Sequence, residues 1–209
     1  MRTETRSPLC ALALLLAFAV GLAGCGEKVP RLAAVGPNDV IVAFGDSLTY
    51  GTGAAEAESY PAVLAQLIGR TVVRAGVPGE MTAGGLARVA GVIEEHRPAL
   101  VIVCLGGNDM LRRVDDAQIR GNLREIIKAI RARGASVVLV GVPKPALITS
   151  APAFYGELAQ EFGIPYEGKI VTSVLYKSEL KSDSIHPNAQ GYRKMAEAIA
   201  ELLKKAGAV

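Results

Sequence analysis

The chain has 209 residues, of which 50% are hydrophobic and 21% are charged. This composition is typical of a single folded domain and excludes a disordered, collagen-like or coiled-coil chain. Its 23 basic and 20 acidic side chains give a net charge of +3, and because no long run of like charge occurs, we expect no nucleic acid as a partner.

Residues 1–24 have the order of a secretory signal. Arg2 and Arg6 precede an apolar run over residues 9–20, and small residues follow. The apolar run is too short to cross a membrane comfortably as a helix. The string Leu-Ala-Gly-Cys that ends at Cys25 resembles the bacterial lipobox, in which the signal is cut before the cysteine and that cysteine carries the lipid.

This interpretation divides the chain into a lipoprotein signal peptide (1–24), a tether (25–38) and a single domain (39–209). A palmitate-type lipid on Cys25 predicts a membrane-anchored lipoprotein of the bacterial cell envelope that faces outside the cytoplasm. Two alternatives are an ordinary signal peptide that leaves Cys25 as a free thiol and an uncleaved N-terminal anchor. Both would also place the domain outside the cytoplasm.

From residue 39 onward, short apolar runs alternate with segments of helical period. The apolar runs predict strands over residues 40–44, 71–75, 99–105 and 136–142, with a weaker strand near 164–166. Apolar residues are continuous in these runs instead of alternating with polar ones. This pattern indicates strands buried on both faces, as in a parallel sheet that helices cover.

The segments between the strands carry apolar residues at helical spacing together with start and stop signals. We expect helices from Ser59 to Gly69, from Thr82 onward, over 116–133, in a segment that ends at Gly163, and over 187–205. A repeated strand–helix order with right-handed crossovers predicts an α/β fold, a three-layer α/β/α sandwich around a parallel sheet.

Polar strings occur where the strands of this fold end. Three follow the first three strands and one precedes the last helix: Gly45–Leu48, Gly76–Glu80, Gly106–Asp109 and Asp183–Pro187. Ligands of open α/β sheets bind at the carboxyl ends of the strands. We therefore expect all four strings to meet at one rim and to form the functional site.

The residue types at this rim are those of a serine acyl-transfer site. Ser47 needs a neighbouring base to become a nucleophile, and histidine suits this task near neutral pH. His186 is the better candidate, because the other histidine, His96, lies among polar residues at a helix end. Asp183, three residues before His186, can orient its ring, although a capping role in the turn is the structural alternative.

Three groups are available to bind an oxyanion: the backbone N–H groups of Ser47 and Gly79 and the side-chain amide of Asn108. Tight turns after strands need glycine as well, and the two roles are compatible. The sequence shows no His, Cys or carboxylate cluster with metal-ligand spacing. We therefore predict no metal and no other cofactor.

These four strings, in this order, resemble the four blocks of the GDSL or SGNH hydrolase family, and within it the bacterial thioesterase I, lysophospholipase and arylesterase group. The resemblance runs from about residue 40 to the C-terminus. It implies a flavodoxin-like fold with five parallel strands. It also implies Ser47 as the nucleophile, Gly79 and Asn108 as oxyanion donors, His186 as the base and Asp183 as its partner.

The chain departs from this group in loops that would form the substrate pocket. Arg74 stands where the group usually has asparagine, Met81 where threonine is common, and residues 144–150 are atypical. None of these departures removes a catalytic group. Candidate pocket walls are the apolar residues of the rim loops, Tyr50, Met110, Leu111, Leu147, Ile148 and Phe154.

The sequence thus predicts a carboxylic ester hydrolase that needs no cofactor and cleaves short- to medium-chain acyl or aryl esters through an acyl-enzyme. Lysophospholipids and thioesters are further candidate substrates. The alternatives are a carbohydrate O-acetylesterase of the cell envelope, a catalytically idle envelope lipoprotein that binds lipid or glycan, and a phosphate- or nucleotide-binding domain. The sequence leaves the oligomeric state open.

Overall fold

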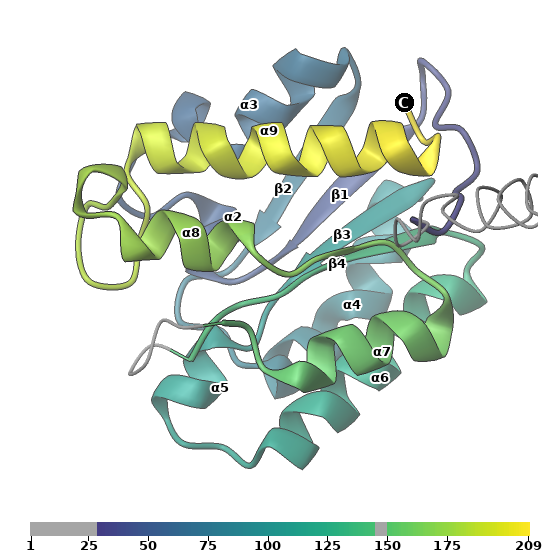
Figure 1. Cartoon of the computed structure of the whole chain (residues 1–209). Coiled ribbons are helices and arrows are strands. Elements are labelled where there is room, and N and C mark those ends of the chain that lie inside the picture. Colours follow the sequence, from purple (N-terminus) through teal and green to yellow (C-terminus); the bar gives the residue numbers. More distant parts are fainter. Residues whose placement is uncertain (1–28, 145–149) are drawn as a thin grey trace, which may run out of the picture.

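A computed structural model of the chain describes residues 29–144 and 150–209, which form one parallel sheet with helices on both faces (Figure 1). The strand order is β2-β1-β3-β4-β5, and all pairs are parallel. The strands are β1 (Val40–Gly45), β2 (Thr71–Gly76), β3 (Leu100–Cys104), β4 (Ser136–Val140) and β5 (Tyr166–Glu167). The predicted three-layer α/β/α fold and five-stranded sheet are confirmed. The predicted signal peptide and Cys25 lie outside the described residues.

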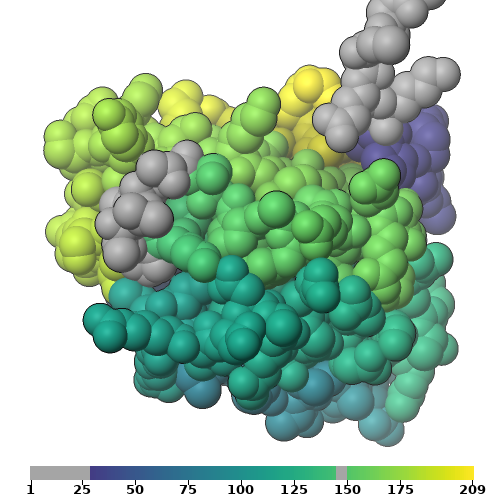
Figure 2. Space-filling model, turned by 60° about the horizontal axis from the view of Figure 1, so that its bottom comes forward, coloured from purple at the N-terminus to yellow at the C-terminus, as the bar shows by residue number. Residues whose placement is uncertain are grey.

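The helices divide between the two faces of the sheet (Figure 1). One face carries α3 (Tyr60–Ile68), α8 (Ile170–Tyr176) and α9 (Ala189–Ala206), and the other carries α4 (Thr82–His96), α6 (Asp116–Ala132) and α7 (Ala153–Phe162). Helices α6 and α7 lie side by side on the surface seen in Figure 2. Within residues 29–144 and 150–209, no helix is both long and apolar enough to cross a bilayer.

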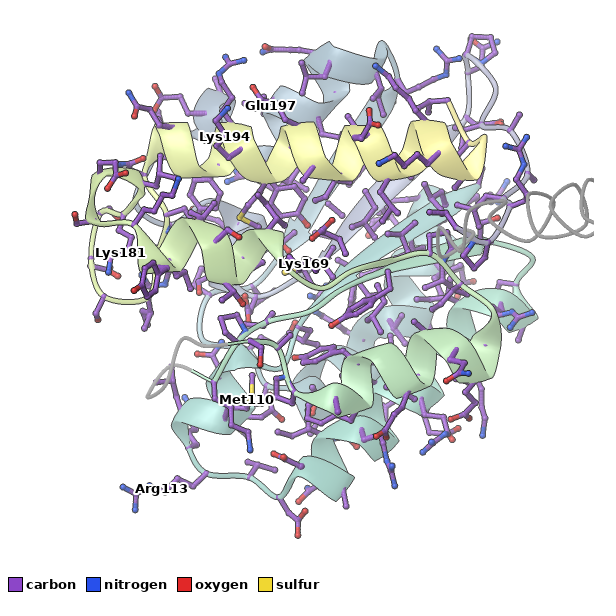
Figure 3. All side chains as sticks on the ribbon, in the orientation of Figure 1. Met110, Arg113, Lys169, Lys181, Lys194 and Glu197 are labelled. Atoms are coloured by element: carbon purple, nitrogen blue, oxygen red, sulfur yellow. The ribbon has the colours of Figure 1, made fainter. Side chains whose placement is uncertain are left out.

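The apolar stripe predicted for residues 116–133 is the buried face of α6. Ile119, Leu123 and Ile130 on this stripe are fully buried, so the helical period determines which face packs on the sheet. The opposite, polar face of a helix points to solvent, as α9 shows. There Lys194 and Glu197 form an ion pair of 2.9 Å on the side away from the sheet (Figure 3). The predicted helix positions are confirmed, but three short helices were not predicted: α2 (Ser47–Tyr50), α5 (Gly107–Leu111) and α8.

The central strands β1, β3 and β4 are buried along nearly their whole length, as expected. The prediction of burial on both faces is wrong for β2, because β2 is an edge strand with one neighbour and its residues are exposed or half-buried. Arg74 in the middle of β2 pairs with Glu56 at 2.9 Å. An apolar run alone cannot distinguish an edge strand from a central one.

The first described residues belong to the packed domain. Val35 is 4% exposed within the core, and its N–H donates to the Ala208 carbonyl at 2.8 Å. The N–H of Leu32 donates to the Ala206 carbonyl at 2.9 Å. The domain therefore begins earlier than the predicted boundary at residue 39, because the end of α9 offers carbonyl acceptors and an apolar surface to residues 29–35.

Replacing the buried Val35 side chain tests this boundary. Val35→Ala should lower the free energy of unfolding by about 2 kcal/mol, since it removes two buried methyl groups and leaves a small void. Urea denaturation of the domain measures the change, with Ala34→Ser at an exposed neighbouring position as the control. Equal midpoints for the Val35→Ala variant and the unchanged protein would show that this segment adds nothing to the fold.

Candidate active site

Ser47 lies at the point where the central strand β1 passes into the short helix α2 (Ser47–Tyr50). The Asp46 carboxylate before it accepts a hydrogen bond from the Leu48 N–H at 3.0 Å and caps this helix. A Cβ atom at Gly45 would overlap the Cys104 carbonyl on the neighbouring strand. Glycine therefore lets the chain turn tightly and bring Ser47 to the rim.

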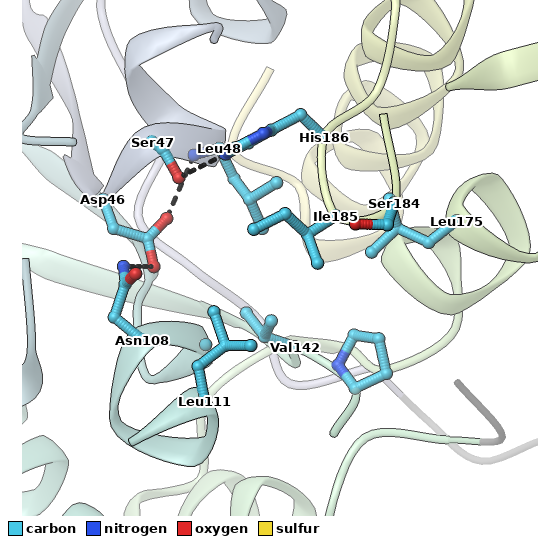
Figure 4. Close-up of a pocket in the computed structure, with 12 residues that line it drawn as sticks. Asp46, Ser47, Leu48, Asn108, Leu111, Val142, Leu175, Ser184, Ile185 and His186 are labelled. Carbon is cyan, nitrogen blue, oxygen red and sulfur yellow. Dashed lines mark hydrogen bonds between the residues drawn. The ribbon is translucent and has the colours of Figure 1, made fainter. Parts of the chain in front are cut away.

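The structure joins the three predicted triad residues by hydrogen bonds, and Figure 4 shows Ser47 and His186 side by side at the pocket. The Ser47 Oγ lies 3.0 Å from His186 Nε2, and His186 Nδ1 lies 2.7 Å from Asp183 Oδ2. Ser47 comes from the end of β1, whereas Asp183 and His186 come from the loop that leads into α9. The fold thus brings together groups that are 139 positions apart in the chain.

The charge of Asp183 determines which nitrogen of His186 carries the proton. Desolvation acts to raise the pKa of Asp183, but hydrogen bonds from the His186 ring and from the N–H groups of Ile185 and His186 outweigh it and lower the pKa. An ionised carboxylate only accepts hydrogen bonds, so His186 carries its proton on Nδ1. Nε2 is then free to accept the Ser47 hydroxyl proton.

Asp183 also shapes the turn that carries His186. Its Oδ1 accepts the N–H groups of Ile185 and His186, both at 2.8 Å. One carboxylate therefore caps the turn through one oxygen and orients the ring through the other. The two interpretations of Asp183 in the sequence, a turn cap and a triad member, both describe this geometry.

Asn108 lies at the start of α5 (Gly107–Leu111) and lines the same pocket as Ser47. Its side-chain Nδ2 donates to the Glu80 carbonyl at 3.0 Å and to Asp46 Oδ2 at 3.3 Å. These bonds use both amide hydrogens, so an oxyanion would have to share one of them. Gly79 lies in an exposed turn directly before Glu80, with a φ of 77° that suits glycine.

An ion pair holds the turn that contains Gly79, and the sequence analysis missed it. Arg88 on α4 donates to both carboxylate oxygens of Glu80, at 2.6 and 2.7 Å. The same guanidinium donates to the Ala75 and Gly45 carbonyls, at 3.0 and 3.2 Å. Arg88 therefore ties this turn to the carboxyl ends of β1 and β2. The eight-residue spacing of Glu80 and Arg88 carries no signal that sequence patterns recognise.

Asp109, which follows Asn108, has a structural role. It is 1% exposed, and it accepts the backbone N–H of Thr82 at 2.9 Å and the Thr82 hydroxyl at 2.6 Å. The Asn122 amide donates to that hydroxyl at 2.9 Å. A buried polar network thus connects α5 with the first turn of α4. Within it, the Thr82 N–H and hydroxyl both have an acceptor in Asp109, as buried polar groups require.

The pocket beside Ser47 is open to solvent, and its volume of about 420 Å³ includes part of the open mouth. Its apolar lining consists of Leu48, Leu111, Val142, Pro143, Leu175 and Ile185 (Figure 4). Among the described residues predicted as walls, only Leu111 lines this pocket. Tyr50 is exposed and lies beside Arg74, and Met110 packs against the core. Phe154 lines a separate cavity between α6 and α7.

Leu147 and Ile148, the other two predicted walls, lie outside the described residues. Within the residues that the structure describes, no group of three His, Cys, Asp or Glu side chains is arranged to hold a metal ion.

Comparison with known proteins identifies relatives of the chain. A model of the GDSL-like lipase/acylhydrolase family matches residues 43–194. Thioesterase 1/protease 1/lysophospholipase L1 of Escherichia coli (strain K12) is 31% identical over 174 residues, which cover 79% of this chain and 84% of that protein. Esterase TesA of Pseudomonas aeruginosa is 30% identical over 177 residues, which cover 78% of this chain and 87% of that protein.

Solved structures show the same architecture. The crystal structure of TesA superposes with a TM-score of 0.72 at 28% identity and covers 80% of this chain and 99% of that one. AlinE4, an SGNH-hydrolase family esterase, superposes with a TM-score of 0.62 at 32% identity and covers 83% of this chain and 98% of that one.

Asp46 makes the stability of the fold depend on pH. Desolvation, reinforced by the nearby Glu80 and Asp109, raises the pKa of Asp46 from 3.8 to about 7, although the Leu48 N–H acts to lower it. The folded protein therefore holds a proton that the unfolded chain releases above pH 3.8. The bound proton therefore stabilises the folded state. Its contribution to the unfolding free energy is complete at low pH and is lost as the pH rises through about 7.

Asp46→Asn removes this titration. Between pH 5 and pH 8, we expect the unchanged protein to lose roughly 2 to 3 kcal/mol more unfolding free energy than the variant loses. Urea denaturation at several pH values measures the difference, and Asp39→Asn at an exposed carboxylate is the control. Parallel curves for Asp46→Asn and the unchanged protein would mean that Asp46 ionises as readily in the fold as in the unfolded chain.

Proposed function

The chain belongs to the GDSL-like lipase/acylhydrolase family and is a carboxylic ester hydrolase, and from this premise we propose which residues catalyse the reaction, which esters they cleave and where the enzyme acts. The observation that carries the proposal is the hydrogen-bonded chain from Ser47 through His186 to Asp183. Its distances are those that a nucleophile, a base and an orienting carboxylate require.

In the first step, the Ser47 Oγ attacks the carbonyl carbon of the ester while His186 Nε2 accepts the hydroxyl proton. Asp183 stabilises the imidazolium that forms, because its ionised carboxylate accepts the Nδ1–H. His186 then gives the proton to the leaving alcohol, and an acyl-enzyme on Ser47 remains. Water activated by His186 attacks this acyl group and releases the acid.

Each attack forms a tetrahedral oxyanion that needs donors already in place. We assign this role to the backbone N–H groups of Ser47 and Gly79 and to the Asn108 amide. The contacts of Asn108 to Glu80 and Asp46 fix its amide beside the pocket. The contact to Asp46 is the longer one, at 3.3 Å. The amide hydrogen that makes it could therefore turn to an oxyanion with the smaller loss of hydrogen-bond energy.

As substrates we propose short- to medium-chain acyl or aryl esters. The pocket lining is mainly apolar, and the pocket is open to solvent instead of forming a long tunnel. The chain has no tryptophan to stack on a sugar ring. Relatives are named thioesterase, lysophospholipase and arylesterase, so thioesters and lysophospholipids remain in the proposed substrate range.

We place the enzyme in the bacterial cell envelope, anchored to a membrane through a lipid on Cys25. The support is the order of charged, apolar and small residues before Cys25 and the lipobox-like string that ends there. In this proposal the mature protein begins at Cys25, and its packed domain begins only a few residues later.

Ser47→Ala tests the catalytic assignment. Hydrolysis of a soluble aryl ester should fall on the order of a million-fold, because no other group can form the acyl-enzyme. Ser184→Ala is a matched control, since Ser184 lines the same pocket but is assigned no step, and its kcat should stay within a few-fold. Labelling by a fluorophosphonate should follow activity in both variants. A folded, fully active Ser47→Ala protein would disprove the mechanism.

A series of aryl esters from acetate to dodecanoate tests the substrate class. Each buried methylene contributes about 0.8 kcal/mol, so kcat/KM should rise roughly fourfold per carbon until the pocket is full and then fall. Leu111→Phe should move the maximum to shorter chains, whereas Leu67→Phe, a similarly exposed leucine on α3, should not. A higher kcat/KM on acetylated glycans than on every aryl ester would instead identify a carbohydrate esterase.

A further inference from the structure

The start of the packed chain and the catalytic site lie at opposite ends of the molecule. Helix α9 begins just after His186 and runs for 18 residues, which is about 27 Å. Leu32 and Val35 bind to carbonyls at its far end. Figures 1 and 2 show the same separation, with the first described residues (purple) at one end and the yellow-green loop that precedes α9 at the other.

The chain between Cys25 and the domain is short. Val29 already packs against the core, and the four residue steps from Cys25 to Val29 span at most about 14 Å when fully extended. A lipid on Cys25 would thus hold the Val29 end of the domain within this distance of the membrane. To bring Ser47 to the same membrane, the domain would have to turn over, and the connecting chain would have to run about the length of α9.

The surface around residues 31–35 carries basic side chains, which we call the anchor-side patch. It consists of Arg31, Arg70, Lys204 and Lys205. Arg31 lies against Gly207, and Arg70 Nε donates to the Val35 carbonyl at 3.2 Å. Two acidic side chains lie beside these residues: Asp39 accepts the Gly36 N–H, and Glu201 pairs with Lys205. The carboxylate of Val209 follows directly after Ala208, whose carbonyl accepts the Val35 N–H.

The patch therefore keeps a net positive charge, which suits an anionic lipid surface. Each basic residue near such a surface contributes about 1 kcal/mol, and one lipid chain together with basic residues binds a membrane more stably than the chain alone. Lys204 and Lys205 also complement the dipole at the end of α9, and both side chains are exposed on the surface.

The exposed apolar side chains at the catalytic end offer a competing contact. Leu111 lines the pocket, and Tyr176, which is 79% exposed, follows the pocket residue Leu175. Arg113 and Lys181 lie at this end as well (Figure 3). A catalytic end that docked on the anchoring membrane would bury these side chains, but the short connection from Cys25 to Val29 opposes that orientation.

We propose that the anchor-side patch lies on the membrane that holds Cys25 and that the catalytic end faces away from it. The enzyme then hydrolyses esters that arrive from the aqueous side and does not hydrolyse esters embedded in its own membrane. This inference rests on the proposed esterase activity and on the proposed lipid anchor. Lysophospholipids would be cleaved as free monomers and not within the anchoring leaflet.

A longer connection to the lipid tests this orientation. The acylated full-length protein is reconstituted into phosphatidylglycerol-containing vesicles whose bilayer holds a fluorogenic long-chain ester. A flexible 30-residue Gly/Ser insertion between Gly26 and Glu27, with a root-mean-square span of about 30 Å, should raise hydrolysis of this embedded ester at least tenfold. Hydrolysis of a soluble aryl ester should stay within twofold. Equal hydrolysis of the embedded ester with and without the insertion would overturn the inference.

The same vesicles also test the two premises, the esterase activity and the lipid anchor, separately from the orientation of the domain. A protein that does not cleave the soluble aryl ester would contradict the proposed esterase site. A Cys25→Ser protein that floats with vesicles as fully as the acylated one would contradict the anchor. Either result overturns the inference through its premise, whereas the embedded-ester comparison overturns the orientation alone.

A spectroscopic comparison measures the orientation directly. A fluorophore on Ala33→Cys, beside the anchor-side patch, should be quenched by lipids that carry a headgroup quencher. The same fluorophore on Ser178→Cys, in the 3₁₀ turn that precedes the His186 loop, should not be quenched. Cys104 is fully buried and stays unlabelled. Quenching of Ser178→Cys as strong as that of Ala33→Cys would show that the catalytic end meets the membrane.

Discussion

The hydrogen bond of 3.0 Å between Ser47 Oγ and His186 Nε2 is the contact on which the site depends. It joins the end of the first strand to the loop before the last helix, so it exists only if α9 is seated correctly. The Tyr192 hydroxyl on α9 donates to the Thr52 carbonyl at 2.8 Å. Gly53 lets the loop before His186 approach so closely that any side chain there would overlap it. These two contacts hold the loop before α9 and the first turn of that helix against the segment that follows Ser47.

The part of the pocket around Asn108 is held by buried polar groups, which are costly unless they form hydrogen bonds. Asp46 accepts hydrogen bonds from Leu48 and Asn108, and Asp109 accepts two from Thr82. Arg88 on α4 holds the turn that contains Gly79 through its ion pair with Glu80. Burial of Asp46 among these groups raises its pKa. The buried position of Asp46 beside Ser47 thus lowers the stability of the fold near neutral pH.

Local patterns predicted most of the strands and helices and the polar strings that the structure brings together at the rim, whereas they did not predict contacts between distant elements. Continuous apolar runs located the strands, but they did not mark β2 as an edge. Leu175 lines the pocket from α8, a helix of seven residues that is too short to show a clear period. Phe154, predicted as a wall, packs in the core and lines another cavity. Which apolar side chain reaches a pocket depends on helix placement, which sequence periodicity does not encode.

The departures from the family pattern show that the triad and the surrounding surface are specified separately. Arg74 lies over the Tyr50 ring at 4.5 Å, pairs with Glu56 and donates to the Tyr50 carbonyl at 2.6 Å. This cluster lies on the edge strand and shares no hydrogen bond with Ser47, His186 or Asp183 in the described structure. The rim beside the pocket can therefore change its charge and shape while the hydrogen bonds that join Ser47, His186 and Asp183 stay intact. Those bonds come from the end of β1 and from the loop before α9, whose turn Asp183 caps.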